Sequence, residues 1–170
     1  MSLQHWAHFH FNRGPVSLSW ATFVSPVSLG ALAVMGINDA WLRRDFPNFL
    51  TGKISDVAVL IFFPFFLMAL LNGAKALLAL IGGIKCVAVP TTRTLGVTIA
   101  FTALVFTLLQ TSPAFVDFYL EFLMEVNVFS WMKSFRYTPD LTDLLTLPTL
   151  IVTYLYGQHR IKRFPLEISA

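Results

Sequence analysis

The amino-acid sequence predicts an all-α fold, a polytopic membrane protein in which two similar hairpins form a four-helix transmembrane bundle. Three observations lead to this prediction: the composition, four long apolar runs, and a polar phrase that occurs twice at the start of such a run. Hydrophobic residues make up 56% of the 170 residues and charged residues 12%, and the mean hydropathy is +0.69. Because soluble domains contain about 25% charged residues, this composition favours a lipid environment. No linker-like segment divides the chain, so residues 1–170 form one predicted domain.

The four apolar runs predict membrane spans at residues 16–37, 54–72, 95–112 and 141–157. A spanning helix needs about 20 mostly apolar residues, and each run has or approaches that length. Pro26 and Pro64 lie inside the first two runs, and membrane helices tolerate proline where neighbours satisfy the freed carbonyl. The fourth run is short unless Asp143 lies in the headgroup layer. The apolar stretch 74–84 is too short between its flanking lysines for another span, so it extends the second helix or lies at the interface.

The segment 114–136, before the last span, has the pattern of an amphipathic helix. The carboxylates of Asp117, Glu121 and Glu125 recur at every fourth position, which places them on one stripe of a helix. Aromatic and aliphatic residues fill most of the other positions. Helices that lie in a membrane surface usually favour Lys and Arg, so we expect this helix to pack on the protein itself or on a partner.

A polar phrase occurs at residues 51–56 (TGKISD) and again at 138–143 (TPDLTD), each time at the start of an apolar run. Ser55 and Asp56 in the first copy match Thr142 and Asp143 in the second. These residue types are typical of helix N-caps and first turns, where a carboxylate stabilises the positive end of the helix dipole. The repeat therefore predicts two hairpins whose acidic ends gather on one side of a membrane.

The distribution of Lys and Arg predicts which side this is. In a four-span topology seven of these residues lie on the side of the termini and five on the other, so we expect both termini in the cytoplasm. Every acidic residue except Glu167 lies on the opposite side, which predicts an acidic extracytoplasmic surface. A cleaved secretory signal is the alternative for the N-terminus, because Ala31-Leu32-Ala33 fits an A-x-A cleavage site. Packing of small residues between helices explains the same positions.

The polar residues at these helix ends are the candidates for binding a cation or a partner. They are Asn38, Asp39, Lys53, Ser55, Asp56, Asp140, Thr142 and Asp143. Converging carboxylates in a low-dielectric setting require a cation, a basic partner or a shared proton. Oxygen ligands suit Ca²⁺ or Mg²⁺, and the weak metal candidates are Asp39, Asp56, Asp140 and Asp143. Salt bridges to nearby Lys and Arg residues, or helix capping, explain the same acids without a metal.

No catalytic residue is predicted from this sequence. It contains no G-x-S-x-G, H-E-x-x-H or P-loop motif, and its single cysteine, Cys86, belongs to no recognisable catalytic pattern. The densest basic group is Arg160, Lys162 and Arg163, directly after an apolar run, where such residues are typical of a membrane-flanking anchor. We therefore expect no nucleic-acid partner, and no cofactor apart from a possible Ca²⁺ or Mg²⁺ ion.

Two stretches resemble a family of small bacterial integral membrane proteins without an assigned function. Asn38-Asp39-Ala40-Trp41-Leu42-Arg43 and the later residues 50–60 are similar to an N-D-x-x-L-K/R stretch followed by L-T-G-K-L-S-D-F-A-G-L. Residues 140–148 are similar to D-P-T-D-L-hydrophobic-x-L-P. The chain departs from these patterns at Val57 and Val59, and in the order of its Pro-Asp pair. The resemblance implies a bacterial membrane protein and carries no reaction or ligand.

Three function classes fit these observations. The first is a non-enzymatic scaffold, accessory subunit or binding module whose acidic surface docks a basic partner. The second is ion or solute translocation through an acid-lined site, because acids inside membranes often mark pathways. The third is an interfacial enzyme acting on lipid or envelope substrates, since paired carboxylates perform acid/base catalysis. We expect the first, in the bacterial cytoplasmic membrane, with the lipid bilayer and a membrane-protein partner or second copy as its neighbours.

Overall fold

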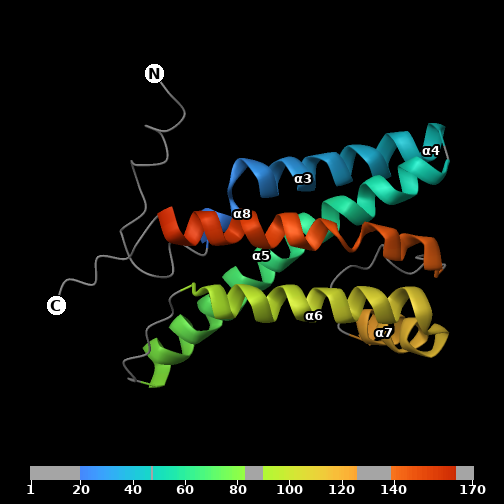
Figure 1. Ribbon diagram of the computed structural model, residues 1–170. Helices are drawn as coiled ribbons and strands as arrows, with labels where there is room; N and C mark the ends of the chain where they lie inside the picture. The colour runs from blue at the N-terminus through green and yellow to red at the C-terminus, as the bar shows by residue number, and fades with distance from the viewer. Residues whose placement is uncertain (1–19, 47, 83–89, 126–138, 164–170) are drawn as a thin grey trace.

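The computed structural model describes residues 20–46, 48–82, 90–125 and 139–163, and within these ranges it contains helices and no strands. Four predicted features extend outside these ranges: the beginning of the first span, the last two residues of the apolar stretch 74–84, the amphipathic segment beyond residue 125, and Thr138 of the second polar phrase. The long helices are α3 (Pro26–Ile37), α5 (Phe49–Gly82), α6 (Thr92–Thr111) and α8 (Thr149–Arg163), which run alternately in opposite directions (Figure 1). The all-α prediction is confirmed.

The first predicted span is broken into two helical pieces within the described residues. Residues 20–23 form one turn of helix, the chain then bends, and Ser25 caps α3 by accepting a backbone hydrogen bond at 3.4 Å. Pro26 follows because proline is well tolerated in the first turn, where its missing N–H has no helical partner. At its other end α3 continues into the π-helical turn η1 (Asn38–Leu42) and the short α4 (Arg43–Asp45).

Helix α5 begins earlier and ends later than the predicted second span. Asn48 and Thr51 exchange hydrogen bonds, from the Thr51 N–H to Asn48 Oδ1 at 2.9 Å and from the Asn48 N–H to Thr51 Oγ1 at 3.1 Å. This reciprocal cap starts the helix at Phe49. The prediction that Ser55 and Asp56 cap this helix is therefore wrong, because both lie inside it. At its far end α5 includes residues 74–82 of the apolar stretch, in agreement with the predicted alternative in which this stretch extends the second helix.

Helix α6 coincides closely with the predicted third span. Thr91 caps it by accepting a hydrogen bond from the Thr94 N–H at 3.0 Å. At the other end Ser112 adopts an extended conformation, and α7 (Pro113–Glu125) starts immediately afterwards. Helix α7 packs against the end of α6, and its Val116 is buried. The described half of the predicted amphipathic segment is thus a helix that packs on the protein.

The predicted fourth span consists of two consecutive helical elements. The 3₁₀ helix η3 (Leu141–Thr146) comes first, and α8 follows it after a turn. Asp140 caps η3 by accepting a hydrogen bond from the Thr142 N–H at 2.8 Å. The cap is therefore Asp140, and the prediction that Thr142 serves as the N-cap is wrong. The last turn of α8 carries the three basic residues of the predicted anchor, where cations stabilise the negative end of the helix.

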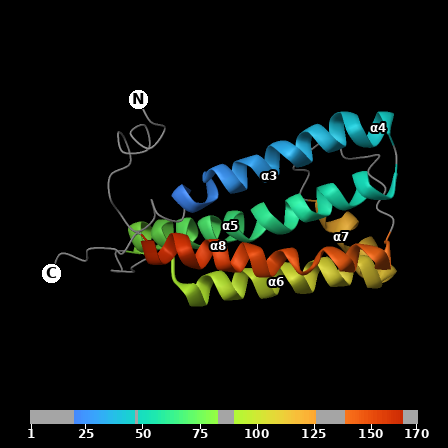
Figure 2. The same cartoon turned by 45° about the horizontal axis from the view of Figure 1, so that its top comes forward.

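Helices α5, α6 and α8 pack against one another, and α3 packs on the outer side of α5 (Figure 2). One buried group joins the three inner helices through Leu60, Phe106 and Leu150. Gly157 of α8 allows this helix to approach α5 and α6 closely beside Phe65 and Leu95. A Cβ atom added there would lie 2.7 Å from Leu95 Cδ2 and 2.9 Å from Phe65 Cε1, so a larger residue does not fit without rearrangement of the core.

Among the described residues, two helices are long and apolar enough to cross a membrane: α5 over Phe49–Ala79 and α6 over Thr92–Thr111. Only 39% and 28% of their most apolar stretches are buried inside the protein, whereas the central helix of a soluble core is buried on all sides. Helices α3 and α8, of 12 and 15 residues, are about 18 and 23 Å long. Each is shorter than the bilayer core of about 30 Å, so the four-span arrangement stays a proposal.

Candidate functional site

Polar side chains from three elements meet at the end of the bundle where α5 begins and α6 ends. We call this group the junction cluster. It consists of Lys53 and Asp56 of α5, Gln110 of α6, and Asp140, Thr142 and Asp143 at the start of η3. It connects chain segments that lie far apart in the sequence but side by side in the bundle (Figure 1).

Lys53 occupies the centre of the junction cluster. Its ammonium donates hydrogen bonds to the carboxylate of Asp143 and, at 2.6 Å, to the Thr142 hydroxyl. The carboxylate of Asp140 lies 3.5 Å away. The ammonium also lies 4.7 Å from the centre of the Phe49 ring, a distance at which the ring face attracts a cation. Since the side chains of Lys53 and Asp143 are only 11% and 15% exposed, this ion pair is screened less than a surface pair.

Gln110 is a buried bridge that the sequence analysis did not identify. Its amide nitrogen donates to Asp143 at 2.8 Å, and its amide oxygen accepts from the Asp140 backbone N–H at 3.0 Å. With only 2% of its surface exposed, Gln110 ties the end of α6 to the start of η3. The available signal was an isolated amide in an uncharged apolar run, because a buried amide requires hydrogen-bond partners.

Asp56 and Asp143, the matching acids of the two polar phrases, lie next to each other. The carboxyl groups of Asp56 and Asp143 lie close enough to interact electrostatically, and the charges of Lys53 and Arg43 also act on Asp56. Two neighbouring carboxylates repel each other, so a positive charge beside them favours their ionised forms. Lys53 supplies part of that charge. This contact is where the structure brings the two copies of the phrase together.

Asp140 lies on the exposed side of the junction cluster. One of its carboxylate oxygens accepts hydrogen bonds from the backbone N–H and the hydroxyl of Thr142, both at 2.8 Å. These hydrogen bonds, together with the nearby charge of Lys53, lower the pKa of Asp140. Asp140 is therefore an ionised helix cap at neutral pH, and its carboxylate adds to the attraction that keeps Lys53 in place.

A second polar group, the hinge cluster, joins η1 to α5. Its members are Asn38, Asp39, Thr51 and Ser55. The Asn38 amide, 1% exposed, donates to the Thr51 carbonyl at 2.6 Å and to the Ser55 hydroxyl at 2.8 Å. The Ser55 hydroxyl in turn donates to Asp39 at 2.5 Å. These hydrogen bonds fix η1 against the first two turns of α5.

The structure thus separates the eight predicted binding residues into two clusters. Lys53, Asp56, Asp140, Thr142 and Asp143 belong to the junction cluster, and Asn38, Asp39 and Ser55 to the hinge cluster. Within the described ranges, no three His, Cys, Asp or Glu side chains lie close enough together to hold a metal ion. The polar contacts found in both clusters join helices to one another.

Comparison with models of protein families, with curated proteins and with solved structures found no match for this chain. The motif resemblance to small bacterial membrane proteins therefore stays a prediction from the sequence.

Proposed function

We propose that the chain is a multi-pass protein of the bacterial cytoplasmic membrane that serves, without catalysis, as a scaffold or accessory subunit for a basic partner protein. Four spans follow if η1 and the turn at residues 20–23 lengthen α3, and if η3 lengthens α8. Exposed apolar side chains along α5 and α6, such as Phe101 (52%) and Leu104 (57%), support contact with lipid. The basic last turn of α8 lies at the end of the bundle opposite to the junction cluster. Its basic residues support a cytoplasmic location for that end of the bundle.

The observation that carries the docking role is a contrast between two groups of acids. In the junction cluster, Lys53, Thr142 and Gln110 already bind the carboxylates of the second polar phrase. On α7, by contrast, the carboxylates Asp117, Glu121 and Glu125 are exposed. A stripe of acids in which neighbouring members are about 6 Å apart along a helix attracts a segment that carries Lys or Arg at a similar spacing.

Two aromatic residues lie beside this stripe, Phe118 at 63% and Phe122 at 52% exposure. Together the three acids and the two rings form what we call the α7 face. Aromatic side chains are enriched at protein interfaces, and an exposed apolar patch next to charges is typical of an interaction site. The α7 face therefore supports a partner with both basic and apolar side chains, such as an amphipathic helix.

The test compares the wild-type protein with a variant that neutralises the α7 face, D117N/E121Q/E125Q. The wild-type protein should resist carbonate extraction from membranes and co-purify in mild detergent with a stoichiometric partner that cross-links to α7. The variant should stay in the membrane but recover about ten-fold less partner, because it lacks the charge attraction. The control is D45N, which neutralises an exposed acid outside α7. A wild-type particle without a partner, or equal recovery by all three proteins, refutes the proposal.

Translocation of an ion is the second candidate, favoured by the contact between Asp56 and Asp143 at the end of a candidate span. A cation or proton would relieve the repulsion between these carboxyl groups. Proteoliposomes distinguish the two roles. Translocation predicts proton or cation flux above that of empty liposomes and its loss in Asp56→Asn and Asp143→Asn. Flux that equals the background rejects this candidate and leaves the scaffold role in place.

A further inference from the structure

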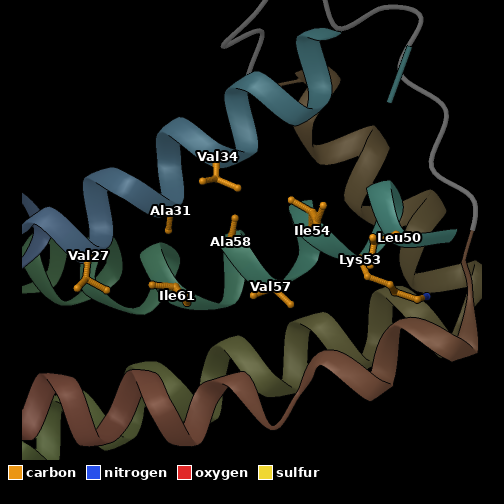
Figure 3. A pocket seen from close by; sticks show the side chains of 9 residues that line it. All are labelled: Val27, Ala31, Val34, Leu50, Lys53, Ile54, Val57, Ala58 and Ile61. Atoms are coloured by element: carbon orange, nitrogen blue, oxygen red, sulfur yellow. The ribbon is translucent and has the colours of Figure 1, made fainter. Parts of the chain in front are cut away.

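A groove of about 420 Å³ lies between α3 and α5 (Figure 3). Val27, Ala31 and Val34 line it from α3, at the spacing of one helix face, and α5 contributes a facing row that includes Ala58. Ala31 and Ala58 have small side chains, so they leave space that larger residues would fill. Val27 and Val34 are 43% and 48% exposed, which means that the groove opens to the surface of the bundle.

The chemistry of the lining selects an apolar ligand. Lys53 is the single polar residue among the nine that line the groove. Figure 3 shows its side chain extending away from α3, and its ammonium is already bound by the junction cluster. The lining along α5 extends from Leu50 to Ile61, about 16 Å. An open apolar groove of this length fits a flexible hydrocarbon chain and offers no polar group to orient a polar ligand.

Two arginines belong to α4, at the end of the bundle where α5 begins and where Leu50 lines the groove. Arg43 and Arg44 of α4 follow η1 directly, and η1 is fastened to the first turns of α5 by the hinge cluster. Within the part of the chain that the structure describes, the charge of Arg43 acts on Asp56, but neither arginine forms a salt bridge or a side-chain hydrogen bond. Arginine binds phosphate oxygens through its planar fork of N–H donors. The mouth of the groove thus complements a phosphate group, and its length complements an acyl chain.

We propose that the groove binds one acyl chain of a phospholipid, with the phosphate of that lipid on Arg43 and Arg44. This inference rests on the proposed membrane location, which supplies the ligand from the surrounding bilayer. A lipid in this place fills the space between α3 and the three inner helices. It contributes to the attachment of α3, which packs on the outer side of α5.

The experiment titrates dioleoyl phosphatidylglycerol into detergent-purified protein and counts bound lipids by native mass spectrometry. Val34→Phe places a ring in the groove from a half-exposed position and should raise the Kd of the tightest lipid about ten-fold, the effect of excluding about two methylene groups. Val97→Phe is the matched control, since Val97 is an exposed valine on α6 (58%) outside the groove. It should leave the Kd unchanged. Ala31→Leu fills the same groove with a smaller side chain. It should also raise the Kd of the tightest lipid, and it replaces Val34→Phe if that variant does not fold.

The variant R43Q/R44Q tests the headgroup contact separately. It should weaken phosphatidylglycerol binding several-fold through the loss of charge-assisted hydrogen bonds. Equal lipid binding by Val34→Phe, Ala31→Leu and Val97→Phe overturns the groove assignment. Unchanged binding by R43Q/R44Q overturns the phosphate contact. Failure of the membrane location itself shows separately, as release of the wild-type protein by carbonate, so the two proposals fail in distinguishable ways.

Discussion

Replacing Lys53 by methionine tests the junction cluster most directly. Methionine keeps an unbranched apolar stem in the same place but removes the ammonium. The variant loses the ion pair with Asp143, the hydrogen bond to Thr142 and the attraction to Asp140. It also leaves Asp56 and Asp143 facing each other with less positive charge beside them. We therefore expect Lys53→Met to be among the most destabilising polar substitutions at this end of the bundle.

The magnitude follows from the burial of the pair. Removing one partner of a fully buried ion pair costs about 3–5 kcal/mol, and a hydrogen bond to a charged group contributes about 1.5–3 kcal/mol. Lys53 and Asp143 keep 11% and 15% of their side-chain surface exposed, which places the cost between these ranges, at about 2–4 kcal/mol. For a protein of this size each kcal/mol lowers Tm by about 2–4 °C. We expect a decrease of about 4–16 °C.

The assay is a double-mutant cycle of Lys53→Met and Asp143→Asn, measured as thermal unfolding in detergent. The double variant should lose less stability than the sum of the single variants, by about 1–3 kcal/mol, because each single change already breaks the shared ion pair. Lys75→Met is the control, since it removes an exposed lysine from the same helix and should change stability by at most about 0.5 kcal/mol. Additive effects, or equal losses in Lys53→Met and Lys75→Met, would refute the reasoning.

Two further predictions concern the core and the cap of η3. Gly157→Leu should destabilise the protein by about 1–3 kcal/mol through overpacking against Leu95, because an added Cβ already lies 2.7 Å from that side chain. Calorimetry or circular dichroism measures the decrease in Tm. Asp140→Asn should lower Tm at pH 7 but have less effect as the pH falls below about 4. The pKa of Asp140 is lower in the folded protein, so its contribution is present above its unfolded-state pKa and is lost on acidification.

Each of these predictions has a matched control in the chain. A Cβ added to Gly96 of α6 would meet no atom within 4 Å, so Gly96→Leu should be tolerated better than Gly157→Leu; the same loss in both variants would contradict the packing argument. For the cap, Asp117→Asn neutralises an exposed acid of α7. A stability difference between wild type and Asp140→Asn that stays constant from pH 7 to pH 3 would show that the cap does not act through its charge.

The helical class and the position of the apolar segments were predictable because both depend on local composition. Hydrophobic runs of spanning length are visible in the chain itself, whereas the prediction that Pro26 lies inside the first helix was wrong, because α3 begins at this residue. The repeated polar phrase also led to the matching acids Asp56 and Asp143, whose carboxyl groups interact electrostatically in the structure. The exact helix starts were less accessible, because competing caps lie a few residues apart. The pair Asn48 and Thr51 determines the beginning of α5 and leaves Ser55 inside the helix.

The sequence by itself determined a very apolar helical chain with its acids concentrated at the ends of the apolar runs, because composition and periodicity are properties of neighbouring residues. Only the tertiary structure decided which polar groups meet. Gln110 and Asp143 are far apart in the chain but hydrogen-bonded. Asp39 accepts a hydrogen bond from Ser55 and does not join the acids of the junction cluster. Such pairings, and the groove left by Ala31 and Ala58, depend on the order and angle in which helices pack. These are set by the shape of the whole core, to which Gly157 and the buried side chains around it contribute.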